Sequence, residues 1–178
     1  LAQRLKGIVI LDHHKTAEAD LKQLPFAVFD MERSGAHLAW RFFHPEEPVP
    51  PLIAYIEDKD LWRFDLPESR EFTAALRSYP MDFELWDRMN VDDLKREGVS
   101  LLRLQDQVVE AHCRRMRWES LGGHRVPVVN ATDYRSEIAN RLCLLHPEAA
   151  FAAAYYDLQD GHRSWSLRSV GDFDVALL

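Results

Sequence analysis

The sequence predicts an α/β protein in which two domains are joined by a long helix. Two short apolar runs rich in β-branched residues, 7–11 and 25–29, have the composition of parallel strands buried on both faces. Apolar residues at helical spacing follow the second run. Residues 92–117 contain no proline and a single glycine, Gly98, and their apolar stripe indicates one long helix. The expected parts are residues 1–90, a linker helix at 91–117, and residues 118–178.

The first part combines these two strands with short helices. Ser34 is a typical helix N-cap residue, and apolar residues follow it at helical spacing as far as Phe43. Pro45 and Pro48 end that helix, and the pair Pro50–Pro51 suits the first turn of the next one. Two more short helices are expected at 68–78 and 82–89.

Charges at both ends of the expected linker helix support it. Asp92 and Asp93 lie at its start, and Arg114, Arg115 and Arg117 lie at its end. This is the favourable arrangement for the helix dipole. With a rise of about 1.5 Å per residue, the helix would be about 40 Å long. A helix of this length commonly joins two domains.

The third part has the pattern of a smaller α/β domain. The pair Gly122–Gly123 separates two short segments and predicts a tight hairpin turn. A second hairpin is expected around 159–161, where Gln, Asp and Gly follow one another. The expected elements are strands at 118–121, 125–130, 149–158 and 162–167, and a helix at 136–145.

Composition limits the classes of protein to which the chain can belong. Its 178 residues include 22 basic and 29 acidic ones, for a net charge of −7, so a strongly basic nucleic-acid footprint is absent. The longest apolar run, 149–156, is far shorter than the roughly 20 residues of a membrane span. Two cysteines exclude a disulfide framework. We expect a cytoplasmic protein without a membrane partner.

The sharpest local motif is Asp12–His13–His14, directly after the first expected strand. Open α/β sheets bind their ligands at the carboxyl ends of their strands. Because adjacent side chains diverge, one histidine would bind a metal and the other would face substrate or solvent. Asp12 could orient the ligating ring through a hydrogen bond. The alternative is a polar turn with two surface histidines.

A second candidate is the acidic segment that contains Glu57, Asp58 and Asp60. Three carboxylates within four residues can bind a hard divalent cation. The alternative is a solvated helix end whose charge is partly neutralised by Lys59 and Arg63.

A third candidate is Arg168, which lies between Ser166 and Ser169 at the end of the last expected strand. An arginine between two hydroxyls can bind a phosphate, and Asn130 and Ser136–Glu137 belong to the same domain. The alternative is an edge-strand arginine with polar neighbours.

Four motifs taken together, in this order along the chain, resemble those of the DHH phosphoesterase superfamily. The motif around Asp12–His13–His14 resembles the signature of that superfamily, and the C-terminal motif resembles its DHH-associated domain. The similarity covers nearly the whole chain. The matching segments are 8–17, 33–36, 58–62 and 166–169 followed by 172–175.

The resemblance implies a parallel-sheet DHH domain, a linker helix and a DHH-associated substrate-binding domain. It also implies a hydrolase that depends on Mn²⁺ or Mg²⁺, with two ions per complete active site. His13 would bind metal, Asp12 would orient the site, and His14 would contact the substrate phosphate. Asp58 would be a further ligand, with Asp60 as the second choice. Arg168, together with Ser169 and Asn130, would bind substrate.

The implied activity is a phosphohydrolase or phosphodiesterase reaction on short oligonucleotides or small nucleotides. Two alternatives remain open: a catalytically degenerate nucleotide-binding module, and a single-strand exonuclease on longer DNA. The oligomeric state, monomer or homodimer, is also open. The superfamily carries aspartate motifs before, and a glycine-rich histidine motif after, the segments matched here. We therefore expect this chain to be part of a longer enzyme and to be inactive alone.

Overall fold

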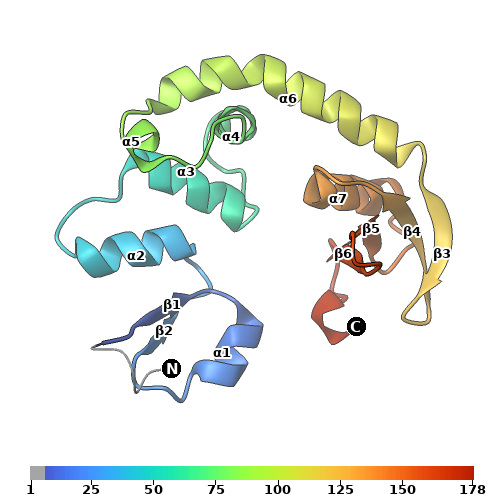
Figure 1. Ribbon diagram of the computed structural model, residues 1–178, viewed down its shortest axis with the longest axis horizontal. Coiled ribbons are helices and arrows are strands. Elements are labelled where there is room, and N and C mark those ends of the chain that lie inside the picture. Colours follow the sequence, from blue (N-terminus) through green and yellow to red (C-terminus); the bar gives the residue numbers. More distant parts are fainter. Residues whose placement is uncertain (1–6) are drawn as a thin grey trace. The chain divides into compact units, whose positions relative to one another are not determined.

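The computed structural model describes residues 7–178, and it has the α/β fold that the sequence predicts. The chain forms two compact units, Leu1–Leu102 and Arg103–Leu178 (Figure 1). The first six residues of the expected domain 1–90 lie outside the described residues. The boundary between the units lies within the long helix α6, Val91–Cys113, so that its first part belongs to the first unit and its last part to the second.

The first unit begins with two parallel strands. β1, Ile10–Asp12, pairs with β2, Ala27–Phe29, so that Leu11 lies opposite Val28. The expectation that these strands are buried on both faces is wrong, because β1 has no buried residue and Val28 is 50% exposed. A sheet of two short strands is too narrow to bury both of its faces.

Helices make up the rest of the first unit. Ser34 caps α2 as predicted, because its hydroxyl accepts a hydrogen bond from the backbone N–H of His37. Pro51 occupies the first position of α3. The structure also contains α1, which is not expected from the sequence. The helices are α1 Lys15–Leu21, α2 Gly35–Phe43, α3 Pro51–Asp60, α4 Ser69–Leu76 and α5 Phe83–Trp86.

The core of this unit lies between α3, α4 and the start of α6. Tyr55, Phe72, Ala75 and Leu94 form a buried cluster there. Gly98 allows α6 to approach α4, because a Cβ at this position would lie 1.8 Å from the carbonyl oxygen of Glu71. The glycine is therefore required by helix packing.

Helix α6 has 23 residues, which corresponds to about 35 Å. It ends at Cys113, four residues before the expected end at Arg117. Arg117 instead begins strand β3 and pairs with Val128, and Met116 packs against the core of the second unit. Tertiary contacts therefore end the helix before the helical spacing of apolar residues in the sequence stops.

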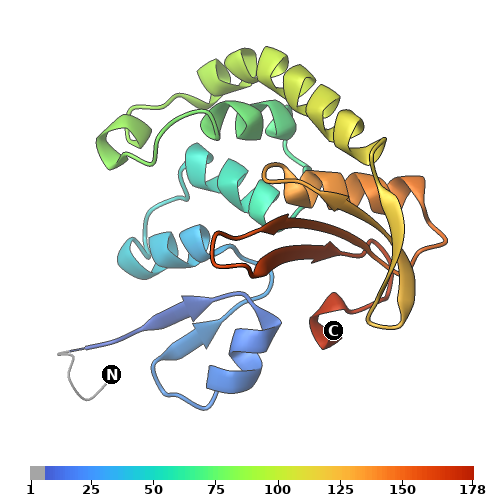
Figure 2. The same cartoon turned by 45° about the vertical axis from the view of Figure 1, so that its right-hand side comes forward.

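The second unit is built on a four-stranded mixed sheet of order β3-β4-β5-β6. Two antiparallel hairpins are joined by α7, which allows β4 and β5 to pair in parallel (Figure 2). Gly122 and Gly123, with φ of 57° and 81°, form the predicted tight turn. The elements are β3 Arg117–Leu121, β4 His124–Asn130, α7 Arg135–Leu145, β5 Ala152–Asp157 and β6 Arg163–Arg168.

The two faces of this sheet have different surroundings. One face, with Val129 and Ala154, packs against α7 and the end of α6. The opposite face carries Val128 and Ala153, and part of it is covered by Phe173 and Val175 from the C-terminal segment. No helix of the described chain is long and apolar enough to cross a membrane.

Candidate functional site

The carboxylate of Asp12 organises the motif at the end of β1. Its Oδ1 accepts hydrogen bonds from the backbone N–H groups of His13 at 2.7 Å and His14 at 3.2 Å. It also lies 2.7 Å from Nδ1 of the His14 ring. The hydrogen bond with this ring is the main reason why the pKa of Asp12 is lowered from its ordinary value. Asp12 therefore stays ionised and holds His14 in one orientation.

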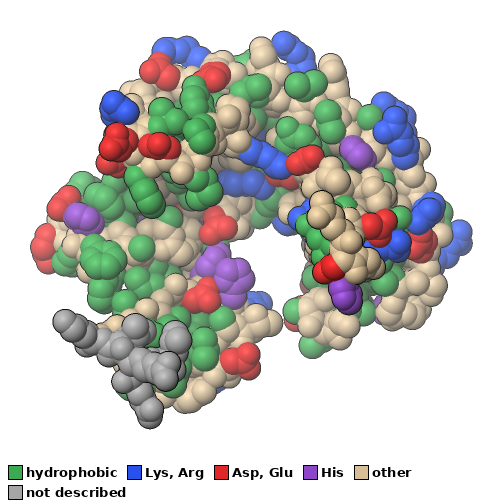
Figure 3. All heavy atoms as spheres, viewed as in Figure 1, with side chains coloured by type: hydrophobic (Ala, Val, Ile, Leu, Met, Phe, Trp, Pro, Cys, Tyr) green, Lys and Arg blue, Asp and Glu red, His purple; other side chains and the backbone are tan. Residues whose placement is uncertain are grey.

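The structure brings together all three residues of the motif. One potential ligand atom from each of Asp12, His13 and His14 lies within 4.8 Å of the others. The two imidazole rings meet edge to face, with centroids 4.4 Å apart. Figure 3 shows histidine side chains gathered beside acidic ones on the surface of this unit. The partner of Asp12 is the ring of His14, whereas the sequence predicts that Asp12 orients the ligating histidine, His13.

Asp60, at the last residue of α3, is the carboxylate that faces His13. Its Oδ2 lies 3.4 Å from Nε2 of His13. The His13 side chain is only 14% exposed, whereas the Asp60 carboxylate is 47% exposed. The imidazole and the carboxylate are therefore close enough to bind one cation from neighbouring positions, and the site is open to solvent on the Asp60 side.

Asp58, the first choice from the sequence, forms hydrogen bonds to the loop that follows α3. It is buried, and its two oxygens accept the backbone N–H groups of Asp65 at 2.9 Å and Leu66 at 3.4 Å. The loop that it holds contains Trp62 and Phe64, both in the left-handed conformation with φ of 58° and 55°. Such a backbone costs free energy in non-glycine residues, and the bonds to Asp58 offset that cost.

Glu57 anchors the start of α2. This buried carboxylate accepts hydrogen bonds from Arg33 Nη1 at 3.2 Å and from the backbone N–H of Ser34 at 2.9 Å. Nδ1 of the buried His37 lies 2.9 Å from its second oxygen. Of the three carboxylates in the acidic segment, two therefore stabilise the fold, and only Asp60 contacts the histidine motif.

Arg168 lies in the second unit, on the sheet face that α7 covers. Its Nε donates to Oδ1 of Asn140 at 3.3 Å, and burial lowers the pKa of its guanidinium from the ordinary value. Ser169 donates from its hydroxyl to the carbonyl of Phe173 at 2.5 Å. Both groups are held in place at the end of β6.

The structure does not bring Asn130 to Arg168. Asn130 pairs with Tyr155, whereas Arg168 pairs with Ala152, three residues away along β5. This offset and the strand spacing separate them by more than about 10 Å. Because successive side chains of a strand point to opposite faces, Asn130 lies on the sheet face of Val128, and Arg168 lies on the other face. A phosphate pocket shared by these two residues is not formed.

The sequence carries a signal for the different positions of Asp58 and Asp60, and the choice between them as metal ligand stays a prediction. Asp58 lies three residues after Tyr55, a position on the same side of the helix, and both are buried. An apolar face of α3 that includes Tyr55 therefore carries Asp58 inward. Asp60 lies outside that face and is available to His13.

Comparisons with known proteins give partial similarity. No known family profile matches the chain. The chain is 29% identical over 182 residues to Uncharacterized protein R106 of Acanthamoeba polyphaga mimivirus, which covers 96% of this chain and 43% of that protein. It is 24% identical over 194 residues to Oligoribonuclease NrnB of Bacillus subtilis (strain 168), covering 93% of this chain and 47% of that protein.

A solved structure of an uncharacterized protein from Helicobacter pylori G27 aligns with 92% of this chain and 60% of that one, at 14% identity and a TM-score of 0.30. The chain spans less than half the length of both curated relatives. Over nearly all of its own length, it is similar to a protein named as an oligoribonuclease.

Proposed function

We propose that this chain is part of a divalent-metal-dependent phosphodiesterase of the DHH superfamily that degrades short oligonucleotides. The observation that carries the proposal is the histidine motif at the carboxyl end of β1, with Asp60 facing His13. The similarity to Oligoribonuclease NrnB supports the choice of substrate. The net charge of −7 favours short substrates over long duplex DNA.

The donor set fits a divalent metal ion. Imidazole nitrogen and carboxylate oxygen are ligands for first-row divalent ions such as Mn²⁺, and carboxylates also suit Mg²⁺. His13 and Asp60 would hold the ion, with Asp12 beside them. Bound metal would polarise the phosphate and lower the pKa of the attacking water. In the proposal the complete site holds two ions.

His14 has the environment of a phosphate-contacting residue. Asp12 holds Nδ1 of its ring, and the side chain is 67% exposed. The carboxylate favours the tautomer that carries a proton on Nδ1. Nε2 of the same ring points away from the carboxylate and can contact a substrate group, accepting a hydrogen bond from a hydroxyl or water in this tautomer and donating one to a phosphate oxygen when the ring carries both protons.

Arg168 and Ser169, both in the second unit, are proposed to bind a phosphate. Burial and the bond to Asn140 fix the guanidinium, which reduces the entropy lost when a phosphate binds. Asn130 is not included in this proposal because it lies on the other sheet face.

The metal site is tested by titrating the purified chain with MnCl₂, by calorimetry and by the electron paramagnetic resonance signal of free Mn²⁺. We expect His13→Ala and Asp60→Asn each to weaken Mn²⁺ binding by about tenfold or more, because the first removes a ligand atom and the second removes the negative charge of another ligand. Asp65→Asn changes an exposed carboxylate of the neighbouring loop and serves as the matched control. Unchanged affinity in His13→Ala would contradict the assignment.

The role of His14 is tested in the protein encoded by the complete gene, with a labelled pentaribonucleotide and Mn²⁺. We expect His14→Ala to lower turnover by about 100-fold or more, as for other groups that act on the reacting atoms. Mn²⁺ affinity should change much less than in His13→Ala. Equal loss of metal in both variants would contradict the division of roles. Nucleotide binding without any hydrolysis by the wild type would favour the degenerate-module alternative.

A further inference from the structure

A second group of side chains, away from Arg168, has the chemistry of a nucleotide-binding surface. It consists of Arg117, Tyr155, Arg163 and Trp165, which we call the aromatic platform. Tyr155 pairs with Trp165 across β5 and β6. Because side chains alternate along a strand, both point to the sheet face of Val128 and Ala153. Arg168 belongs to the opposite face, which α7 covers.

The members of the aromatic platform contact one another closely. The rings of Tyr155 and Trp165 have centroids 5.0 Å apart. The guanidinium of Arg163 lies 4.1 Å from the centre of the Tyr155 ring and 5.7 Å from that of Trp165. Arg117 donates from Nη2 to the Tyr155 hydroxyl at 2.9 Å. These contacts hold two aromatic rings and two guanidiniums in one arrangement.

One end of this sheet face is covered and the other is open. Phe173 and Val175 pack over Phe151 and Ala153. Beyond them Trp165 is 36% exposed, and Arg117 and Arg163 are exposed as well. The indole ring of Trp165 is therefore partly accessible to a single-stranded base, whereas Tyr155 is only 6% exposed.

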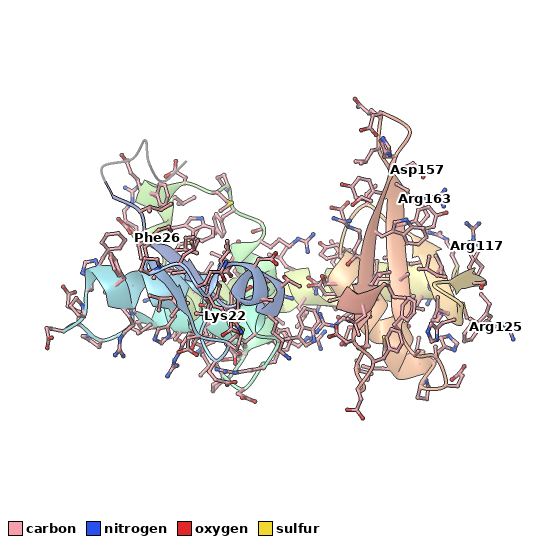
Figure 4. The ribbon with its side chains drawn as sticks, turned by 90° about the horizontal axis from the view of Figure 1, so that it is seen from below. Lys22, Phe26, Arg117, Arg125, Asp157 and Arg163 are labelled. Atoms are coloured by element: carbon pink, nitrogen blue, oxygen red, sulfur yellow. The ribbon has the colours of Figure 1, made fainter. Side chains whose placement is uncertain are left out.

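The charges of the aromatic platform are balanced. Arg163 pairs with Asp157 through Nε at 2.9 Å, and Arg117 pairs with Glu119. Figure 4 shows Asp157 and Arg163 together on the β5–β6 hairpin, with Arg125 farther away. These ion pairs weaken attraction to phosphate, so stacking of bases becomes the main source of binding energy.

We propose that the aromatic platform binds single-stranded oligonucleotides by stacking a base on Trp165, with Arg163 and Arg117 beside the adjoining phosphates. Aromatic rings with neighbouring guanidiniums are the usual means of holding single strands without sequence preference. This surface is separate from the histidine motif and does not require hydrolysis.

The test is fluorescence anisotropy of a labelled pentaribonucleotide with the purified chain at low salt in EDTA. We expect Trp165→Ala and Arg163→Ala to weaken binding by about tenfold or more, and Trp165→Phe to retain most of it. Arg125→Ala is the matched control, because Arg125 lies over Trp118 at 5.1 Å in the same unit but outside the aromatic platform. It should bind as the wild type does.

Two further measurements distinguish base stacking from attraction between charges. A pentamer of abasic sugar phosphates has no base to stack. Its affinity for the wild type should therefore be as low as the affinity of the normal pentamer for Trp165→Ala. Asp157→Asn should bind RNA more tightly and with a steeper salt dependence, because it frees Arg163.

Circular dichroism melting should show that the variants remain folded. His13→Ala should bind the pentamer normally in EDTA, so that failure of the proposed metal site does not affect this result. Equal binding by Trp165→Ala and Arg125→Ala, or self-association through Trp165 in sedimentation, would overturn the proposal.

Discussion

At the scale of single residues, the two cysteines are buried and bonded to the backbone. The sulfur of Cys113 contacts the carbonyl of Ile138 at 3.9 Å, and that of Cys143 contacts the carbonyl of Arg168 at 3.0 Å. Burial, followed by the charge of Glu110, raises the pKa of Cys113 to about 11, and burial also raises the pKa of Cys143. Both thiols therefore stay protonated in the native state at neutral pH.

We expect both cysteines to react slowly with a thiol reagent such as DTNB at pH 8 and rapidly after unfolding, because the thiolate is the reactive form. The unfolded chain loses its Cys113 proton near pH 9.0, and the folded chain near pH 11. The folded state therefore binds more protons in this window, and its free energy of unfolding should fall as pH rises from about 9 to about 11. Cys113→Ala should reduce this fall. A stability that is flat with pH in this range would contradict the burial of the thiol.

The candidate site was partly predictable at this scale. The residue types and their order along the chain are enough to single out Asp12, His13, His14 and the acidic segment. Which of Asp58 and Asp60 is available to a metal ion depends on which carboxylate is already hydrogen-bonded to the backbone amides of Asp65 and Leu66. The helical spacing from Tyr55 indicates only that Asp58 lies on the buried side of α3, and the fold of the following loop decides which amides it faces.

At the scale of elements, Gly98 decides how closely α6 approaches α4. In an exposed helix interior, Gly→Ala stabilises by about 1 kcal/mol. Here we expect Gly98→Ala to destabilise the chain by about 1–3 kcal/mol, because the new methyl group would overlap the carbonyl oxygen of Glu71. Urea unfolding followed by circular dichroism measures the change.

Val99→Ala is the control on the same helix, because Val99 is 50% exposed. Its free energy of unfolding should differ from wild type by less than about 1 kcal/mol. If Gly98→Ala stabilised the chain, α4 and α6 would have to lie far enough apart to leave room for the added methyl group.

Most elements were predictable because caps, prolines and glycines mark them locally. Ser34, Pro51 and the Gly122–Gly123 turn occur where the sequence predicts. The end of α6 was not predictable, because Arg117 joins the sheet of the second unit and Met116 packs against the core of that unit. Helix α1 was also missed, since its seven residues contain none that is buried and therefore no clear apolar stripe.

At the scale of the whole molecule, each unit has a core of its own. Phe72 belongs to the cluster of the first unit, whereas Ile138 belongs to a cluster of the second. We expect Phe72→Ala to cost about 3–5 kcal/mol and to reduce hydrogen-exchange protection in α3 and α4. Protection of β4 and β5 should remain close to that of the wild type.

The reciprocal variant completes this experiment. Ile138→Ala should lower protection in β4 and β5 and leave α3 and α4 unaffected. If either change lowered protection equally throughout the chain, the two units would unfold as one cooperative body.

Strands and helices of both units could be expected from the sequence pattern, but residues could not be paired across strands. Asn130 and Arg168 are both polar residues at strand ends, so they are equivalent by sequence pattern alone. Only the register of β4, β5 and β6 places them on opposite sheet faces. The same register assembles the aromatic platform from residues that are 38 positions apart, Arg117 and Tyr155.

The parallel pairing of β4 with β5 also has a consequence for how the second unit folds. The β3–β4 and β5–β6 hairpins join near neighbours and can form within about 1–10 μs. Val128 and Ala153, in contrast, are 25 positions apart, and α7 lies between them. Bringing them together has a loop-closure cost that precedes any gain from pairing. The two hairpins should therefore form early, and their docking around α7 should set the refolding rate of this unit.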